Sequence, residues 1–349
     1  MKRLVNLLPV AFCSLMLSAF VGCSEDADAL MSGDNQTSDR VSFWVEDMED
    51  VQATTRGAQA TLSALDAGFG VSCSVYPSSG TYTSYPCGSY FYKLQAFPGV
   101  ETDYYWPETD SKMAFYAYYP YGNSNFTVQS AASANGAPTY AYTVPEAIAS
   151  QVDVMTTQVV DRLASNHAAV PLSFAHRCTD IRFRAYNQQS EALTVTSIAI
   201  YGVKYAGTYT SGTSWSLSGS VNSSSSHPFL LSLNTAVASK ATVDLTGATN
   251  HFIMLPQTVS NGTDFLVIKT QEDGEERTYT YTLDSSYELV MGKSVTFQLT
   301  LGNGTLTVNP VSVVDWEPIS TVTNGFSVTD CRLSSPASDL KLQIIQIYI

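Results

Sequence analysis

Few residues of this chain have the types and spacing that catalysis or metal binding requires. Zinc sites need His or Cys ligands a few residues apart, and no two of the four histidines stand at such a spacing. The chain also contains no HExxH motif, no GxSxG motif and no glycine-rich phosphate loop. His176 follows Phe174 in a strand-like context, which favours a packed or surface histidine. The sequence therefore predicts no enzyme activity, no catalytic residue, no metal site and no cofactor.

Two other kinds of residue cluster could bind a ligand. Acidic residues gather at 46–50 and at 272–276, and the first group could bind calcium. It lacks the spaced ligands and the glycine of an EF-hand loop, so we interpret both groups as solvated charge. Aromatic faces suit sugar recognition, and Trp106 or Trp215 could stack on a glycan. The alternative is that Trp106 fills a hydrophobic core.

The first 22 residues have the pattern of a secretory signal. Lys2 and Arg3 precede a mostly apolar run from 4 to 21, and Gly22-Cys23 closes it. This ending resembles the bacterial lipobox, which implies cleavage between Gly22 and Cys23 and lipidation of Cys23. The lipid would anchor the protein to the outer membrane. The alternative is an ordinary signal that is cut elsewhere.

The residues after Cys23 are predicted to be a flexible tether, residues 23–40. Its acidic start, residues 24–28, is similar to the surface-export signal of lipoproteins in the Bacteroidota, and the alternative is a solvated linker. The rest of the tether is rich in Gly, Ser, Asp and Asn. Further along the chain, Cys73 and Cys87 flank a Pro/Ser/Gly/Tyr segment, so they are candidates for a loop-closing disulfide in an exported protein.

Composition and charge limit the class of protein. The chain has 31 acidic and 17 basic residues in 349, a formal charge of −14, so binding to nucleic acid is not expected. Only 14% of the residues are charged, while 21 Tyr, 15 Phe, 21 Gly and 14 Pro favour half-buried strands joined by turns. This composition argues against a helical enzyme, a coiled coil or a disordered chain.

The hydrophobic pattern predicts strands along most of the mature chain. Residues 181–186 and 295–301 alternate in polarity, and 115–119 is an aromatic run. Asp273-Gly274 indicates a hairpin, expected to have a loop longer than two residues. Helical periodicity is weak, with a short helix expected only near Leu62 or Ser150.

Short strands with regular turns predict an all-β fold of two β-sandwich domains in tandem. We place the first domain at residues 41–166 and the second at 167–320. Residues 321–349 form a C-terminal tail.

Several segments in order resemble the fimbrillin family, the FimA/Mfa-like lipoprotein pilins of the Bacteroidota. The family fold is two β-sandwiches of transthyretin-like type, in agreement with the strand pattern. The resemblance covers about residues 41–316, and Trp316 stands where the last strand of the family commonly carries a Trp. The segments that carry it include Tyr105-Trp106-Pro107, Phe115-Tyr116-Ala117-Tyr118-Tyr119-Pro120, Asp153-Val154-Met155, Val170-Pro171-Leu172-Ser173-Phe174-Ala175-His176, Leu255-Pro256-Gln257 and Gly292-Lys293-Ser294-Val295-Thr296-Phe297.

The resemblance implies a mode of assembly. Family pilins are cut by an extracellular arginine-specific protease, which releases the anchor and an N-terminal strand and leaves a groove for a strand of another subunit. Here Arg56, followed by Gly57, is the candidate cleavage site, and residues 41–45 are the strand that would be removed. The alternative is that Arg56 is an ordinary surface residue.

The tail ends in a long apolar segment, residues 340–349, which we interpret as a candidate donor strand. Ten extended residues span about 33 Å, and an exposed strand this apolar would aggregate unless paired. Residues 334–338 before it have the composition of a hinge. The alternative is that the segment pairs within its own subunit. Its apolar residues alternate and change phase once: Leu340, Leu342, Ile344, Ile345, Ile347 and Ile349.

The sequence thus predicts a structural subunit of cell-surface fimbriae, exported as an outer-membrane lipoprotein and assembled by β-strand exchange with other fimbrial subunits. The alternative is a surface lipoprotein adhesin that does not polymerise and binds a host glycan or protein.

Overall fold

The structure is a computed structural model of the chain, and it describes residues 39–45, 62–80, 88–107, 110–129, 137–302 and 304–316. Within these ranges the regular secondary structure is almost entirely β-strand. The helical elements there are α1 (Leu62–Asp66) and the 3-10 turn η1 (Ile148–Ser150), close to the two expected positions. The predicted all-β fold class is confirmed.

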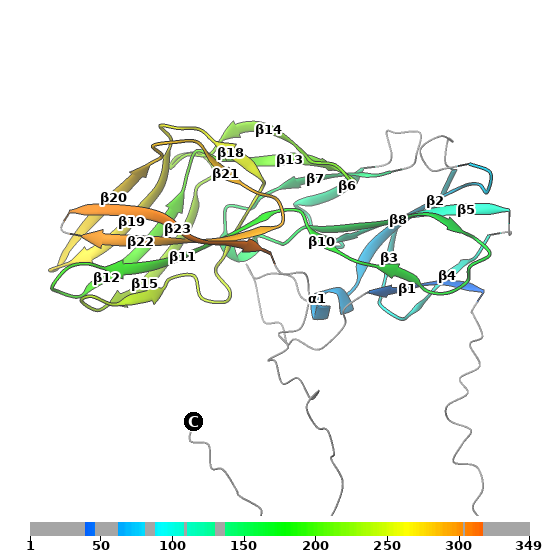
Figure 1. Ribbon diagram of the computed structural model, residues 1–349, viewed down its shortest axis with the longest axis horizontal. Helices are drawn as coiled ribbons and strands as arrows, with labels where there is room; N and C mark the ends of the chain where they lie inside the picture. Colours follow the sequence, from blue (N-terminus) through cyan, green and yellow to red (C-terminus); the bar gives the residue numbers. More distant parts are fainter. Residues whose placement is uncertain are drawn as a thin grey trace, which may run out of the picture. The chain divides into compact units, whose positions relative to one another are not determined.

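Two sheets enclose a first hydrophobic core (Figure 1). One has the strand order β4-β1-β9 and the other has the order β10-β8-β5-β2-β3. Side chains from both sheets meet in this core, among them Val41, Phe43, Phe69, Phe115 and Val170. The strands are β1 (Arg40–Val45), β2 (Phe69–Pro77), β3 (Gly88–Ala96), β4 (Glu101–Tyr105), β5 (Ser111–Tyr119), β8 (Met155–Leu163), β9 (Val170–Leu172) and β10 (Ala175–His176).

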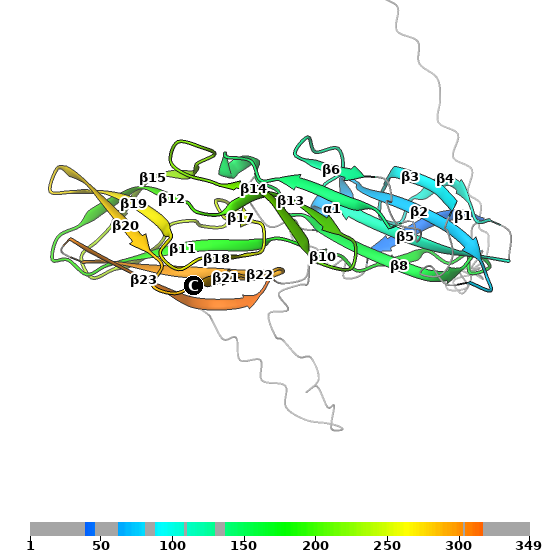
Figure 2. The same ribbon diagram turned by 90° about the horizontal axis from the view of Figure 1, so that it is seen from above.

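A second pair of sheets encloses a second core. Strand β11 lies between β16 and β22 in one sheet, which ends at β23, and also pairs with β17; the facing sheet has the order β15-β12-β19-β20. Figures 1 and 2 show β11, β22 and β23 side by side. The strands are β11 (Thr179–Asn187), β12 (Leu193–Ile200), β15 (Phe229–Val237), β16 (Thr242–Asp244), β17 (Phe252–Met254), β19 (Asp264–Glu272), β20 (Glu275–Thr282), β22 (Lys293–Gly302) and β23 (Thr305–Asp315).

The polarity pattern explains why these segments are strands. In β11 the side chains of Ile181, Phe183 and Ala185 are buried, while those of Arg182 and Arg184 between them are partly exposed. Successive side chains of a strand point to opposite faces, so one face of β11 enters the second core. Strand β5 instead is buried on both faces from 113 to 118. Met113, Phe115 and Ala117 face the first core, while Ala114 and Tyr116 pack in a separate cluster, and the sequence is accordingly a continuous apolar run.

The hairpin between β19 and β20 corrects one expectation. Glu272 pairs with Glu275, so the loop consists only of Asp273 and Gly274, with φ of 51° and 84°. A longer loop was expected because the apolar runs end earlier, at 270 and 278. The polar residues in between extend the ladder, and Asp-Gly suits the left-handed backbone of a two-residue turn.

A further sheet, β14-β13-β7-β6, combines strands from distant parts of the chain. Tyr140 and Tyr142 of β7 belong to the second core together with Tyr209 of β13. Residues before 167 therefore contribute to the second core, and the division into domains 41–166 and 167–320 stays a prediction. The strands are β6 (Phe126–Gln129), β7 (Thr139–Thr143), β13 (Lys204–Thr210) and β14 (Trp215–Val221); β18 (Gln257–Val259) and β21 (Tyr287–Leu289) form a two-stranded sheet.

Candidate functional site

One face of strand β1 lines the first core. The side chains of Val41, Phe43 and Val45 are buried, while Trp44 is 52% exposed, so the strand alternates strictly. The ring of Phe43 meets those of two core phenylalanines edge to face, at 6.1 Å from Phe69 and 5.7 Å from Phe115. The core of this sandwich is therefore incomplete without these six residues of the chain.

Both neighbours of β1 come from later in the chain. β1 runs antiparallel to β4 and parallel to β9, with Phe43 beside Val170 and Val45 beside Leu172. The Phe43 carbonyl accepts a hydrogen bond from the backbone N–H of Gly99 at 2.8 Å. β1 is thus an inner strand, and we call the position between β4 and β9 the β1 site.

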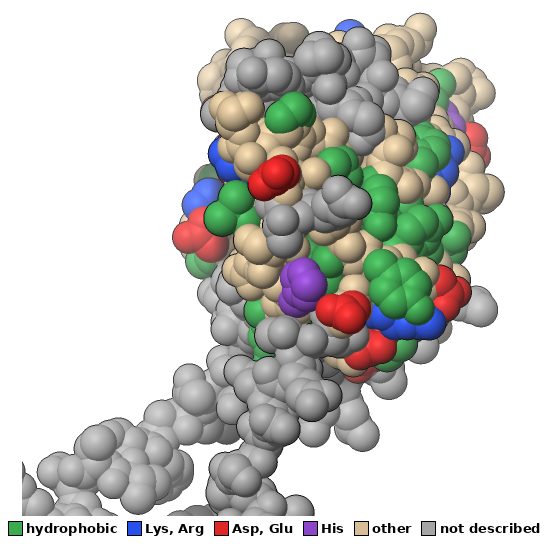
Figure 3. Space-filling model, turned by 90° about the vertical axis from the view of Figure 1, so that its right-hand side faces the viewer, with side chains coloured by type: hydrophobic (Ala, Val, Ile, Leu, Met, Phe, Trp, Pro, Cys, Tyr) green, Lys and Arg blue, Asp and Glu red, His purple; other side chains and the backbone are tan. Residues whose placement is uncertain are grey.

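The outer face of the β1 site is polar at one end and apolar at the other. Arg40 Nη1 lies 3.1 Å from Asp103 Oδ1, and the guanidinium lies over the ring of Tyr105. Ser42 is paired with the exposed Glu101, and Trp44 with Pro171. Figure 3 views the molecule from the side where β1 and β4 lie, and shows hydrophobic side chains gathered beside acidic and basic ones.

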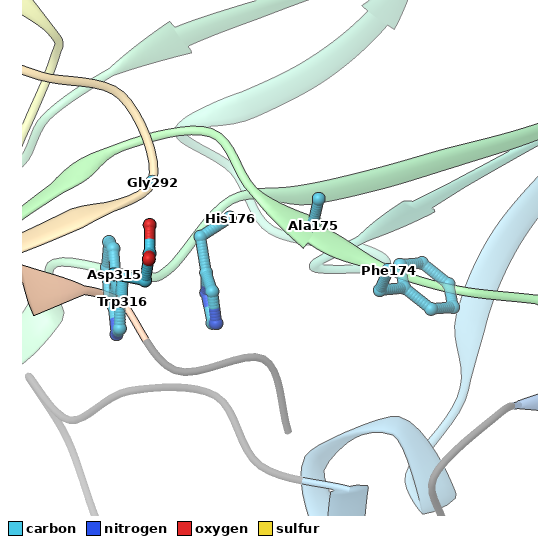
Figure 4. Close-up of a pocket in the computed structure, with 6 residues that line it drawn as sticks. All are labelled: Phe174, Ala175, His176, Gly292, Asp315 and Trp316. Carbon is cyan, nitrogen blue, oxygen red and sulfur yellow. The ribbon is translucent and has the colours of Figure 1, made fainter. Parts of the chain in front are cut away.

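A small pocket lies beyond β9, where the chain passes from β9 to β10. The rings of His176 and Trp316 stack at 4.5 Å with an interplanar angle of 8° (Figure 4). Behind them, His176 Nδ1 lies 2.7 Å from Asp153 Oδ2, and both of these side chains are buried. The pocket holds about 220 Å³ and is lined mostly by apolar surface of Phe174, Ala175, His176, Gly292, Asp315 and Trp316. His176 is therefore a packed histidine, as the sequence predicts.

Strand β23 ends its sheet and pairs with β22 alone among the described strands. Its side chains are exposed on both faces from 309 to 315, including Val311, Val313 and Val314. A long apolar edge of this kind favours pairing with another strand.

A buried carboxylate in the second core has a structural explanation. Asp180 Oδ2 accepts hydrogen bonds from Arg182 Nε and Ser294 Oγ, both at 2.7 Å, and its other oxygen lies 3.1 Å from His251 Nδ1. Burial alone would raise the pKa of Asp180, but the contacts with His251, Arg182 and Ser294 together lower it below its usual value. No three acidic, His or Cys residues in the described ranges are grouped as metal ligands.

Most residues that the sequence singled out lie outside the described ranges. Cys73 is described and buried in the first core; its predicted disulfide partner Cys87 is not described, so this bond stays a prediction. The residues outside the described ranges are Gly22, Cys23, Arg56, Gly57, Cys87, Leu340, Leu342, Ile344, Ile345, Ile347 and Ile349.

Neither tryptophan proposed to stack on a glycan presents a free ring. Trp106 is buried in the first core and stacks on His167. Trp215 is partly buried against Tyr209, and its Nε1–H donates a hydrogen bond to the Arg177 carbonyl at 2.6 Å. The sequence did not reveal Glu101, Pro171 or the pocket, because these depend on contacts between strands that are far apart in the chain.

Comparison with known proteins shows to which family this chain belongs. Residues 60–316, more than half of the chain, match the family described as fimbrillin-like. The chain belongs to the fimbrillin-like family. Membership implies a fimbrial or adhesion protein located at the cell surface.

One solved structure shows that this fimbrillin-like protein shares its fold with a fimbrial protein. A fimbrial protein of Bacteroides vulgatus is 19% identical with a TM-score of 0.58, over 80% of this chain and 99% of its own. A candidate cell adhesion protein of Bacteroides ovatus is 14% identical with a TM-score of 0.45, over 80% and 98%. No curated protein matches the chain. In the described part of this fimbrillin-like protein, no helix is long and apolar enough to span a bilayer.

Proposed function

We propose that this protein is a structural subunit of cell-surface fimbriae that is exported as an outer-membrane lipoprotein and assembled by β-strand exchange, contributing to adhesion. One observation carries the proposal: β1 is an inner strand with three buried side chains, and it is also the first strand of the described chain. A strand in this position can be removed by a single cut of the chain after it.

The candidate cut lies at Arg56-Gly57, between β1 and α1 in the sequence. Cleavage there would separate residues 23–56, with the lipidated Cys23 and β1, from the rest of the chain. Burial of a side chain such as Val or Phe contributes about 1.5–3 kcal/mol, so loss of Val41, Phe43 and Val45 would expose an apolar slot. The facing edges of β4 and β9 would also lose their hydrogen-bond partners, which is the condition for β-augmentation.

The C-terminal segment 340–349 has the properties of the incoming strand. It is long and apolar, its polarity alternates over residues 340–344, and it follows residues 334–338, which have the composition of a hinge. Other fimbrial subunits, including further copies of this chain, are the partners that such a strand would join. The alternative of a non-polymerising adhesin that binds a glycan or host protein loses Trp106 and Trp215 as its binding platform, because both are packed.

Deletion of residues 340–349 tests the proposal. Purified protein without its signal peptide is treated with an arginine-specific protease, and polymers are counted as ladders that resist dissociation on gels. We expect the full chain to polymerise, and the deletion variant to stay monomeric with an unchanged melting temperature. A control carrying Gln343→Ala and Gln346→Ala keeps the length and the apolar residues and should polymerise. Undiminished polymers of the deletion variant would show that this segment is not the donor.

A further inference from the structure

The β1 site continues beyond the end of β1. β1 stops at Val45, beside Leu172, whereas the chain of β9 runs on through Ser173 and Phe174 into β10. β10 is the terminal strand of its sheet and pairs with β8. A strand that occupied the β1 site and was longer than β1 would therefore run along residues 173–176, on the side away from β8.

The pocket of Phe174, His176 and Trp316 lies at the end of this path (Figure 4). His176 follows Leu172 by four residues, or about 13 Å of extended chain. The lining is mostly apolar, and the volume of about 220 Å³ accommodates one aliphatic side chain. The indole Nε1–H of Trp316 is buried and finds no hydrogen-bond acceptor among the described residues. A buried donor without an acceptor is unfavourable, and a carbonyl of an incoming strand would satisfy it.

The C-terminal segment matches this path in length, and over residues 340–344 also in phase. It has ten residues, against six in β1. If Leu340 takes the place of Val41, then Leu342 and Ile344 take the buried places of Phe43 and Val45. Residues 345–348 then run beside residues 173–176, toward the pocket of Phe174, His176 and Trp316.

Charge supports the same alignment. Lys341 would take the place of Ser42, which is paired with the exposed Glu101 of β4. Directly opposite residues of antiparallel strands are about 4.5–5.5 Å apart, so Lys341 and Glu101 would form an ion pair across the joint.

We propose that the donor strand of one subunit enters the β1 site of the next in a single register, with Leu340 at the position of Val41, Lys341 opposite Glu101 and residues 345–348 beside residues 173–176. This register rests on the proposed strand exchange. The competing register places Ile345 at the position of Val41, Gln346 opposite Glu101 and Tyr348 beside Pro171, and leaves residues 173–176 without a partner from residues 340–349.

A cross-linking experiment distinguishes the two registers. Directly opposite residues lie within the Cα separation that a disulfide requires, so we combine Lys341→Cys with Glu101→Cys in one chain. After protease treatment and mild oxidation, this variant should give a covalent ladder on non-reducing gels. Each single variant should not. A ladder from Gln346→Cys combined with Glu101→Cys, and none from the first pair, would overturn the register while leaving strand exchange intact. Failure of the unmodified chain to polymerise would instead refute the proposed function.

A second measurement tests the charge pairing. Lys341→Glu should reduce the yield about two- to fivefold, and adding Glu101→Lys should restore it, as for exposed ion pairs.

Discussion

At the scale of single residues, the described chain uses its buried charges for stability. Asp180 is held by Arg182, Ser294 and His251, and Asp153 by His176, and the side chains of both carboxylates are buried. Breaking such a pair is costly because the remaining charge stays buried. The contacts of both carboxylates are thus explained by packing within the folded chain.

The contacts of Asp180 predict how stability depends on pH. The pKa of Asp180 is lowered in the folded state, so its contribution is complete above the unfolded pKa of about 3.9 and is lost as the pH falls through the folded value. We therefore expect the unfolding free energy to decrease steeply below about pH 4. Asp180→Asn should lower it by about 3 kcal/mol at pH 7 and flatten this acid dependence. Urea unfolding of both proteins between pH 3 and pH 7 measures the effect, and parallel pH profiles would contradict it.

At the scale of elements, removal of β1 would open the first core, because β1 lies between two neighbours and contributes buried side chains to this core. The proposed cut after Arg56 predicts that Arg56→Ala blocks the release of residues 23–56. On cells, the mature N-terminus should change from Gly57 to lipidated Cys23, and polymers should be lost. N-terminal sequencing of the surface protein is the measurement. Arg40→Ala is the control, since this arginine lies within β1 and should leave the cut unchanged. A mature N-terminus at Gly57 in Arg56→Ala would mean that the protease has another specificity.

Much of the strand content was predictable because local pattern determines it. Residues 181–186 and 295–301 alternate, and they lie within β11 and β22. The pairing of β1 with β9 was not predictable, since Phe43 and Val170 are 127 residues apart and nothing in either segment encodes the other. The loop length at Asp273-Gly274 was misjudged because polar residues at a hairpin tip still form ladder hydrogen bonds.

The candidate site was predictable only in part. The alternation of residues 41–45 indicates a half-buried strand, but its inner position depends on β4 and β9 together. The pocket combines Phe174 and His176 with Trp316, from segments more than 130 residues apart, and its stacked rings follow from tertiary packing alone.

At the scale of the whole molecule, the proposed lipid on Cys23 determines where the precursor is held. Each buried methylene contributes about 0.8 kcal/mol, so several acyl chains hold a protein firmly in a bilayer. Cys23→Ser should therefore move the precursor from the membrane fraction to the soluble fraction, as measured by detergent partitioning and by mass spectrometry of the N-terminal peptide. Cys13→Ser lies within the signal and should change neither result. Membrane retention of Cys23→Ser would point to a different anchor.

The mixed pairing of β1 has a consequence for any filament built through its site. A strand that enters in the direction of β1 lies antiparallel to β4 and parallel to β9, so joints formed in this direction would all have the same orientation. Such head-to-tail contacts generate open chains wherever the rotation between successive subunits does not close a ring. The two tips of the resulting fibre would be chemically different, one exposing a vacant slot and the other an unused tail, and lengthening would require each newcomer to recognise one particular tip.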